Sequence, residues 1–520
     1  MNTTEFLTIA AAIVPDRPAV IFEGKEFTFA QIAERSNRLA NALLAMGIKK
    51  GDRIAVIQVN CNEYLEIYNA VAKVAGIMAP LNFRAKEDEL TYMLTNSESQ
   101  VLFVGDRYLD LARRMRASLP AVQQYVSIDS RQPDMLYYKD LIAGYPGDEV
   151  FAEIDDNDVT ILMYTAGTTG RPKGVPQRHS GFASYMLNNV QPADPEVNEV
   201  NLLTVPLYHV AGIQAMLAAT YGGRTLAMMR QFEVKEWMET VQRTRATRAM
   251  LVPTMLKRVI DDPDFNKYDL SSLKVITYGA APMPFEVVKK AIEMLPEVRF
   301  INAFGQTETA STICMLGPED HDLRCEPVLK EKKLRRLQAS IGHPLPDVEM
   351  KVIDPESGAD LALGETGMIV ARGPRVMSGY WNDAEKTRQA MTAEGWLRTS
   401  DMGYQDEDGY FYLAGRADDM IIRGGENISP EEVEQVLHSH PKLDEVAVIG
   451  VPDTEWGQEV MAVCVLKAEQ TATPEEVIDF CRNRISSFKR PRYVVFCEAL
   501  PRNPMGKVLK RNLREEYGQK

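Results

Sequence analysis

Cysteine and long apolar runs are scarce in this sequence. Its 520 residues include six cysteines, and no two of them form the Cys-x-x-Cys pair of a zinc or redox site. Their irregular spacing also suggests no disulfide framework, which favours a reducing compartment. No stretch reaches the ~18 uncharged apolar residues of a membrane span. The apolar residues 6–14 lack the preceding Lys or Arg of a secretory signal, so we expect a core helix there, in a cytoplasmic protein without a membrane span.

Basic residues are also in deficit. Lys and Arg total 59 against 73 Asp and Glu, a formal net charge of −14. Nucleic acid and anionic membrane surfaces both attract clustered positive charge, so this balance argues against nucleic acid as a partner. Hydrophobic residues at 45% and charged residues at 25% are ordinary for a folded chain, and the length allows about two to five domains. One basic cluster is interpreted as a solvated face, with phosphate contact as the alternative: Lys330, Lys332, Lys333, Arg335 and Arg336.

Residues 1 to about 400 alternate helical patterns with short β-rich runs. One example is the helical pattern at 32–44, followed by a β run at 53–58 and a second helical run at 63–73. Such alternation predicts an α/β fold with parallel sheets and helices packed against them. We expect one large body of two or three subdomains.

After Trp396 the pattern changes to that of a small α+β unit. Residues 403–405 and 410–413 flank Asp406-Glu-Asp-Gly409, which favours a hairpin because Gly409 tolerates positive φ. Capping boxes are predicted at Ser429-Pro-Glu-Glu432 and at residues 473–476. Strands are predicted at 446–451, 460–466 and 493–496. The domain boundary therefore falls at 416–419, between a body of residues 1–415 and a domain of residues 420–520.

A Gly/Thr-rich loop follows the predicted strand 159–164. Its glycines, its hydroxyls and the cation of Lys173 suit a phosphate group. It is no Walker A loop, because GK[ST] is absent, and Pro176 disfavours a helix directly after it. Most short Gly/Thr loops are plain turns, so its specificity depends on the surrounding motifs.

Seven segments together resemble the adenylate-forming acyl-CoA synthetase superfamily, in that family's order and along essentially the whole chain. The resemblance implies a large body with mostly parallel sheets and a β-barrel-like part, and a small mobile C-terminal domain. It implies an acid–thiol ligase that uses ATP, Mg²⁺ and coenzyme A to convert a small-molecule carboxylate to acyl-AMP and then to acyl-CoA. The segments are 164–175 (YTAGTTGRPKGV), 208–212 (YHVAG), 302–308 (NAFGQTE), 364–383 (GETGMIVARGPRVMSGYWND), 396–401 (WLRTSD), 415–427 (GRADDMIIRGGEN) and 501–511 (PRNPMGKVLKR).

The first step joins two anions, a carboxylate and an α-phosphate, so it needs positive charge. The resemblance implies that Glu308 holds Mg²⁺, Thr307 contacts the α-phosphate, and the loop 165–174 holds the β- and γ-phosphates. Lys507 would bridge the carboxylate and the phosphate. Without the family pattern, Lys507 would be a surface lysine and Glu308 an ordinary carboxylate at a helix end.

For the nucleoside, the resemblance places Phe304 on one face of the adenine, residues 279–281 on its other side and Asn302 at the exocyclic amine. Asp401 would accept the ribose hydroxyls with the help of Arg416. The implied ATP/AMP-binding set is Thr165, Gly167, Thr168, Thr169, Gly170, Lys173, Gly279, Ala280, Ala281, Asn302, Ala303, Phe304, Gly305, Asp401 and Arg416.

The second step needs a thiol at the acyl carbonyl. The resemblance implies that the small domain rotates about a hinge, residues 416–419, centred on Asp418. The rotation would bring a loop to the body that lines a pantetheine channel, although the same loop alone would be an ordinary tight turn. The implied channel residues are Arg423, Gly424, Gly425 and Glu426.

The acyl pocket would open at His209, and its implied walls are small or apolar. Small walls leave a wide pocket and resemble those of aryl and ring-acid ligases, so we favour a compact aromatic or alicyclic acid over a medium-chain fatty acid. No Asp stands at residues 208–209 to hold an amino acid's ammonium. The implied pocket residues are His209, Val210, Ala211, Gly279, Ala303, Gly305 and Ala310.

Two other functions stay open from the sequence alone. One is an acyl-AMP ligase that loads a carrier protein, although no carrier domain is visible. The other is an inactive acyl-ligand sensor, which the presence of Lys507, Glu308, Asp401 and Lys173 disfavours. A homodimer is compatible with either function.

Overall fold

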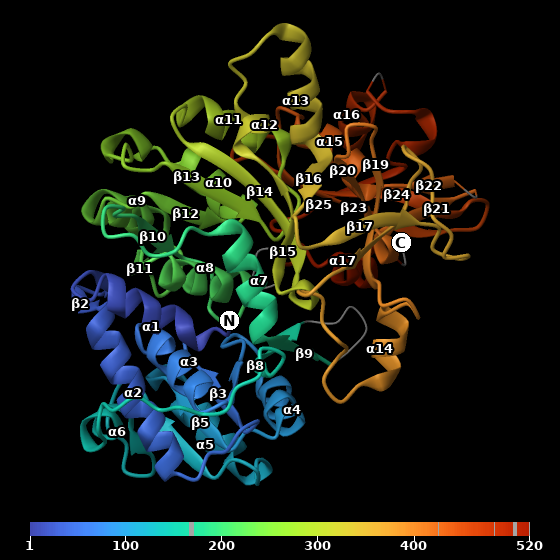
Figure 1. The fold of residues 1–520 in the computed structure, drawn as a ribbon. Coiled ribbons are helices and arrows are strands. Elements are labelled where there is room, and N and C mark those ends of the chain that lie inside the picture. Colours follow the sequence, from blue (N-terminus) through green and yellow to red (C-terminus); the bar gives the residue numbers. More distant parts are fainter. Residues whose placement is uncertain (166–170, 425, 483, 503–506, 519–520) are drawn as a thin grey trace.

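The computed structural model describes residues 1–165, 171–424, 426–482, 484–502 and 507–518 (Figure 1). Two large sheets and their helices build most of the chain, and a three-stranded sheet and a hairpin build its C-terminal part. No helix in these ranges is long and apolar enough to cross a membrane.

The first large sheet is built mainly from residues 53–178. The strands are β3 (Arg53–Ile57), β4 (Ile77–Pro80), β5 (Val101–Val104), β6 (Gln124–Ser127), β7 (Leu136–Tyr137), β8 (Val159–Thr165) and β9 (Lys173–Arg178). The covering helices are α2 (Phe29–Ala45), α3 (Glu63–Lys73), α4 (Glu87–Ser97), α5 (Leu109–Met115) and α6 (Tyr138–Gly144). The strand order is β7-β6-β5-β3-β4-β8-β9, parallel except for the last pair.

Alternation along β3 explains why helices cover both faces of this sheet. Ile54 and Val56 belong to the apolar cluster that contains α2 and α3, whereas Ala55 and Ile57 belong to the one that contains α4 and α5. Successive strand residues point to opposite faces, so a continuous apolar strand needs a cover on each side. The predicted helix, strand and helix at 32–73 are confirmed.

The second large sheet runs through the middle of the molecule in Figure 1. Its strands are β1 (Pro18–Phe22), β2 (Lys25–Thr28), β10 (Val200–Leu203), β11 (Thr225–Met228), β12 (Arg248–Leu251), β13 (Val275–Gly279), β14 (Arg299–Gln306), β15 (Ser311–Leu316), β16 (Ser340–Pro344), β17 (Glu349–Ile353), β18 (Gly367–Arg372), β19 (Leu397–Gln405) and β20 (Phe411–Arg416). Its order is β17-β18-β19-β20-β16-β15-β14-β13-β12-β10-β11-β1-β2.

The pairs from β14 to β1 in this order are parallel, and the pairs from β14 to β17 are antiparallel. The resemblance implies a barrel-like part in this region. In the structure the antiparallel strands β15 to β20 continue the large sheet. The accompanying helices are α1 (Thr4–Ile13), α7 (His179–Asn189), α8 (Val210–Tyr221), α9 (Val234–Thr244), α10 (Pro253–Ile260), α11 (Phe285–Met294), α12 (Pro318–His321), α13 (Pro327–Ala339) and α14 (Ala384–Ala390). Residues of α8 pack on one face of the parallel part, and residues of α9, α10 and α11 on the other.

The C-terminal part has a core of its own. Its elements are β21 (Ile421–Arg423), β22 (Glu426–Ile428), α15 (Pro430–His438), β23 (Leu443–Asp453), β24 (Gly457–Leu466), α16 (Pro474–Phe480), β25 (Tyr493–Phe496) and α17 (Lys510–Tyr517). β23, β24 and β25 form one sheet, with α15 and α16 in the apolar cluster on one face and α17 in that on the other. A large body and a small α+β domain are therefore confirmed. The boundary at 416–419, which falls on the 3-10 turn Ala417–Asp419, stays a prediction.

Two local predictions had different outcomes. The hairpin forms, since β19 ends at Gln405, β20 begins at Phe411 and Gly409 has φ +85°. The capping box at Ser429 forms only in part. The Glu432 amide donates to Ser429 Oγ (3.3 Å), but the Glu432 carboxylate pairs with Lys489 (2.7 Å) and is thereby drawn away from the cap. The second box, at Thr473, is complete.

Candidate functional site

A cavity of about 300 Å³ lies between the carboxyl ends of β13 and β14 and the C-terminal domain. It brings together residues that are more than 200 positions apart in the chain. The sequence-predicted residues that line it are Gly279, Ala280, Ala281, Asn302, Ala303, Phe304, Gly305, Asp401, Arg416 and Lys507.

One wall of this cavity is backbone. β13 and β14 are parallel neighbours, with Gly279 opposite Ala303, and a Cβ on Gly279 would overlap the Ala303 carbonyl. The next residue, Ala280, has φ +67° and turns the chain away from the strand. Only glycine allows the two strands to approach each other this closely, so no side chain of residue 279 enters the cavity.

Asn302 and Phe304 are two residues apart on β14, so their side chains lie on the same face of the sheet. Phe304 packs against the apolar cluster that contains Ile341 and Phe411, so its ring is supported from behind. Asn302 donates from Nδ2 to the Ser340 carbonyl (3.3 Å). This hydrogen bond leaves the side-chain oxygen of Asn302 as its acceptor atom.

Asp401 is 8% exposed and is fixed by two neighbours. Gln306 Nε2 donates to Asp401 Oδ2 (2.7 Å), and Arg416 Nε lies 3.7 Å from Asp401 Oδ1. Burial raises the pKa of Asp401, while the charges of Arg416 and Lys507 oppose the rise. Sequence reasoning missed Gln306, although it lies inside the segment 302–308, because the hydrogen bond depends on how β14 and β19 meet.

Lys507 brings its ammonium group to the same cavity from the C-terminal domain. Burial lowers its pKa, as does the nearby Arg416, and Asp401, Asp419 and Glu431 act in the opposite direction. The following basic residue, Lys510, pairs with Glu434 (2.8 Å). A largely buried cation beside a second cation favours an anionic ligand.

A second polar group lies at the base of the Gly/Thr loop. The Tyr380 hydroxyl donates to Glu308 Oε1 (2.9 Å), and Lys173 Nζ lies 4.9 Å from the centre of the Tyr380 ring. The Trp381 amide donates to the Gly174 carbonyl (2.8 Å), which ties this segment to β9. Sequence reasoning gave Tyr380 no role, although it lies in the segment 364–383. Its pKa is raised, mainly by burial and then by Glu308.

The loop itself is described only at its ends. Thr165 pairs with Lys173 in the β8–β9 register, which brings the first and last predicted phosphate contacts together. Thr307 accepts at its backbone oxygen from Gln177 Nε2 (2.5 Å). The predicted phosphate contacts that lie outside the described residues are Gly167, Thr168, Thr169 and Gly170.

The predicted acyl-pocket residues lie in several places, and Gly279 and Gly305 line only the first cavity. Ala211 and Ala303 line a second cavity, of about 210 Å³, and Ala303 borders both cavities. Val210 and Ala310 are instead buried in the apolar core. His209 caps α8, where its Nδ1 accepts from the Ala211 amide (3.3 Å). Burial lowers the pKa of His209 to about 4, so the ring is neutral at neutral pH.

The predicted coenzyme A loop lies apart from the cavity. Arg423 Nη2 donates to Glu459 (2.7 Å), and Gly424, with φ +59°, donates its amide to the Trp456 carbonyl (2.8 Å). Glu426 opens β22, Gly425 lies outside the described residues, and Asp418 lies in the turn Ala417–Asp419. In this arrangement the segment with Lys507, rather than the 423–426 hairpin, faces the site.

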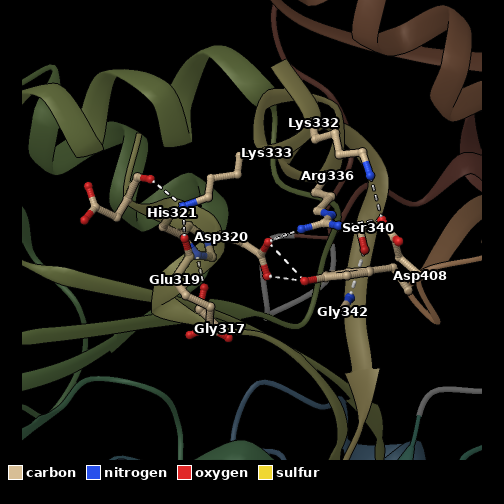
Figure 2. A network of polar contacts seen from close by, with 12 residues as sticks. Gly317, Glu319, Asp320, His321, Lys332, Lys333, Arg336, Ser340, Gly342 and Asp408 are labelled. Atoms are coloured by element: carbon tan, nitrogen blue, oxygen red, sulfur yellow. Dashed lines mark hydrogen bonds and ion pairs between the residues drawn. The ribbon is translucent and has the colours of Figure 1, made fainter. Parts of the chain in front are cut away.

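The basic cluster on α13 is part of a structural network (Figure 2). Arg336 pairs with Asp320 (2.9 Å) and Asp408 (3.0 Å), and its guanidinium lies 3.7 Å from the centre of the Tyr410 ring. Lys332 also pairs with Asp408 (3.2 Å). The interpretation as a freely solvated face is thus wrong for Arg336, because these contacts tie α13 to α12 and to the β19–β20 turn.

The same network supports the cavity wall. His321 Nδ1 lies 2.6 Å from the Gly317 carbonyl, and His321 Nε2 lies 2.8 Å from the hydroxyl of Tyr278, which precedes Gly279. A carbonyl can only accept, so Nδ1 carries the proton and Nε2 accepts from Tyr278. Burial lowers the pKa of His321 to about 4.

A backbone slot, a buried carboxylate and a lysine from a second domain, all at one cavity, are the parts of an adenylate-forming ligase. The chain belongs to the AMP-binding enzyme family: the profile of that family matches residues 7–381, and the profile of the AMP-binding enzyme C-terminal domain matches residues 432–507. The protein is accordingly an AMP-forming acid–thiol ligase.

Named relatives cover nearly the whole chain. The fatty acid–[acyl-carrier-protein] ligase ScoC of Streptomyces coeruleorubidus is 32% identical, over 97% of this chain and 94% of its own. The indoleacetate–CoA ligase of Aromatoleum aromaticum is 32% identical, over 100% of this chain and 99% of its own. A solved structure of the anthranilate CoA ligase AuaEII with anthranoyl-AMP has a TM-score of 0.90 at 27% identity, covering 99% of this chain and 97% of its own.

The first prediction concerns the Tyr380 hydroxyl, which donates a hydrogen bond to Glu308. We expect Tyr380→Phe to lower kcat/KM for acyl-AMP formation by about tenfold or more, because a hydrogen bond to a charged group contributes about 1.5–3 kcal/mol. Pyrophosphate release with ATP and the best acid measures it. Tyr404→Phe is the matched control, since Tyr404 stacks on Tyr412 (4.9 Å between ring centres). Equal rates for the two variants would refute the role of Tyr380.

His321 generates a pH prediction. Its folded pKa of about 4 lies below the ~6.5 of an unfolded histidine, so the unfolded chain binds the extra proton as the pH falls. The stability from this group is present above about pH 6.5 and is lost toward pH 4, which amounts to roughly 2 kcal/mol between pH 7 and pH 5. We expect His321→Gln to reduce the drop in unfolding free energy between these two pH values by that amount. Urea titrations at both pH values measure it, and an unchanged drop would contradict the assignment.

Proposed function

We propose that this protein is an AMP-forming carboxylic acid–CoA ligase that acts on a compact cyclic carboxylate, aromatic or alicyclic. The observation that carries the proposal is the meeting of Lys507, Asp401 and Arg416 with the Gly279–Ala303 wall at one cavity. The reaction has two steps, carboxylate plus ATP to acyl-AMP plus pyrophosphate, and then acyl-AMP plus CoA to acyl-CoA plus AMP.

In the first step a carboxylate oxygen attacks the α-phosphorus, and the bond from phosphorus to the pyrophosphate oxygen breaks. Lys507 would place its ammonium between the two anions and reduce their repulsion, and Thr307 would contact the α-phosphate. Lys173 and the ends of the loop at Thr165 would bind the departing phosphates. Preorganised positive charge of this kind lowers the barrier because it need not reorganise during the reaction.

Glu308 fits a magnesium site in its chemistry. Mg²⁺ takes oxygen ligands and is usually held by one or two carboxylates together with substrate phosphates. Tyr380 orients the Glu308 carboxylate through its hydroxyl (2.9 Å). Bound with ATP, the metal ion would supply further charge neutralisation on the phosphates.

The adenosine would occupy the backbone slot. Phe304 would stack on one face of the adenine, residues 279–281 would lie on its other side, and the Asn302 oxygen would accept from the exocyclic amine. Asp401 would accept both ribose hydroxyls. Gln306 and Arg416 hold this carboxylate in place (2.7 and 3.7 Å), and both oppose the rise in its pKa that burial causes.

The second step would follow a rotation of residues 420–520 about the hinge 416–419, centred on Asp418. Lys507 would leave the site, and the segment from Arg423 to Glu426 would replace it and line the thiol's path. Because Arg423 now pairs with Glu459 within the small domain, the loop can move as part of that domain.

The acid is proposed from the walls and the relatives. Ala211, Gly279, Ala303 and Gly305 leave width beside the carboxylate, and two relatives are named for indoleacetate and anthranilate. A medium-chain fatty acid is the second candidate. ScoC, named for a fatty acid and a carrier protein, favours a test of both alternatives, the chain acid and the carrier acceptor.

The proposal predicts ATP–pyrophosphate exchange without CoA when a ring acid is present. The panel is benzoate, cyclohexanecarboxylate, cyclohexenecarboxylate, octanoate, acetate and an amino acid, with free CoA and a phosphopantetheinylated carrier protein compared afterwards as acceptors. We expect a ring acid to give the fastest exchange and CoA to accept the acyl group. Exchange with octanoate alone would replace the ring acid by a fatty acid, and no exchange would refute the proposal.

Lys507 should matter for one half-reaction only. We expect Lys507→Ala to slow acyl-AMP formation by about 10²–10³-fold, the typical cost of losing one group that stabilises transition-state charge. Thioester formation from preformed acyl-AMP and CoA should change by no more than a few-fold. Lys442→Ala, which removes a surface cation paired with Glu476 (3.0 Å), is the control. Equal loss in both half-reactions would contradict the assignment.

A further inference from the structure

The second cavity extends away from the reaction centre along the sheet. It lies between α7 and α8 on one side and β10 to β15 on the other, with Ala211 and Ala303 at its inner end. At its far end it is lined by Arg224, which precedes β11, and by Arg248, the first residue of β12. Ala303 also borders the nucleotide cavity, so an acid that reacts there would extend its remaining atoms into this space.

The strand register gives the length of this space. Arg248 is paired with Val275 on β13, and Gly279, which lies four residues further along β13, is paired with Ala303 on β14. At about 3.3 Å per residue the two levels are ~13 Å apart along the strands. Arg248 itself lines the cavity, so an acid that spans this distance reaches the level of its side chain.

The lining is far more polar than a hydrocarbon tail would require. Tyr185, Gln214 and Thr312 line the cavity, as does Asn201. The buried Oδ1 of Asn201 has no hydrogen-bond partner within the described part of the chain. Gln214 and Thr312 pair with each other (3.3 Å), whereas a methyl-terminated chain would leave the Asn201 oxygen unpaired, at a free-energy cost.

The far end carries more positive than negative charge. Arg224 Nε lies 2.7 Å from Glu199, and Arg248 Nη1 lies 3.3 Å from the other oxygen of the same carboxylate. The nearby Arg375 is balanced by Asp347 (2.8 Å). Two guanidinium groups thus share one carboxylate. Burial and Arg248 both lower the pKa of Arg224, which an added anion would relieve.

We propose that the acid carries a second carboxylate at its far end, which binds to Arg248 with the support of Arg224. This proposal rests on the proposed function, because it assumes that the acyl group occupies the second cavity. It makes these two arginines specificity-determining residues. Arg248 is 28% exposed and Arg224 13%, so Arg248 is the one with room for a bidentate contact.

The test compares acids that differ only in the second carboxylate. The pairs are cyclohexanecarboxylate with trans-1,4-cyclohexanedicarboxylate, and octanoate with octanedioate, each in ATP–pyrophosphate exchange. We expect the dicarboxylate of at least one pair to have a kcat/KM tenfold or more above that of its monoacid. Exchange in which both monoacids equal or exceed their dicarboxylates would overturn this inference and leave the proposed function intact. Absence of exchange with every acid would overturn both.

A substitution of Arg248 then tests whether this residue causes the preference for the dicarboxylate. Arg248→Met leaves Glu199 paired with Arg224, so no buried charge loses its partner. We expect the preference for the dicarboxylate to fall by about ten- to a hundredfold, while exchange with the monoacid is retained. Arg248→Lys should restore part of it. Arg245→Met is the matched control, since Arg245 lies outside the cavity and pairs with Asp269. A dicarboxylate preference that is unchanged in Arg248→Met would refute the role of this residue.

Discussion

The close backbone contact between β13 and β14 is the constraint on which the rest of this site depends. At Gly279 and Ala303 the two strands leave no room for a Cβ on the first. Alternation along β14 then turns Asn302 and Phe304 toward the nucleotide cavity and Ile301 toward the second one. One strand thus separates two cavities, and both border Ala303, where the proposed reaction would bring an α-phosphate and a carboxylate together.

Positive charge at this meeting point comes from Lys507 of the C-terminal domain, which the proposed rotation would carry away from the site. The segment with Lys507 is held by ion pairs within the C-terminal domain, such as Lys510 with Glu434 (2.8 Å) and Arg502 with Glu445 (2.9 Å). Contacts to the body include the ion pair of Lys257 with Asp444 (2.9 Å), part of which is exposed to solvent. Partly exposed pairs contribute little stability. The domain thus has ion pairs that hold its own order and are independent of the body, as the proposed rotation requires.

The sequence predicted what depends on local pattern or on whole motifs. Strand and helix positions follow from periodicity, and residues of four of the seven motif segments line one cavity. It could not predict Tyr380 or Gln306, because their roles depend on hydrogen bonds between segments that are far apart in the chain. It also assigned Val210 and Ala310 to the acyl pocket, whereas the structure buries both in the core. A small residue at a motif position indicates tight packing, but the pattern does not tell whether the neighbour is a ligand or a side chain.

On the proposal that the acyl group occupies the second cavity, selectivity for the acid comes from that cavity, because every carboxylate presents the same atoms at Ala303. A longer or shorter apolar tail changes the binding free energy by only ~0.8 kcal/mol per methylene, which discriminates poorly between similar acids. Polar groups discriminate more strongly, since a ligand that leaves them unpaired bears their desolvation cost. Arg224 and Arg248 therefore say more about the acid than the small walls near Ala211 do. In the proposed complex, the small walls would set the width of the space, and the arginines would select the chemical group at its end.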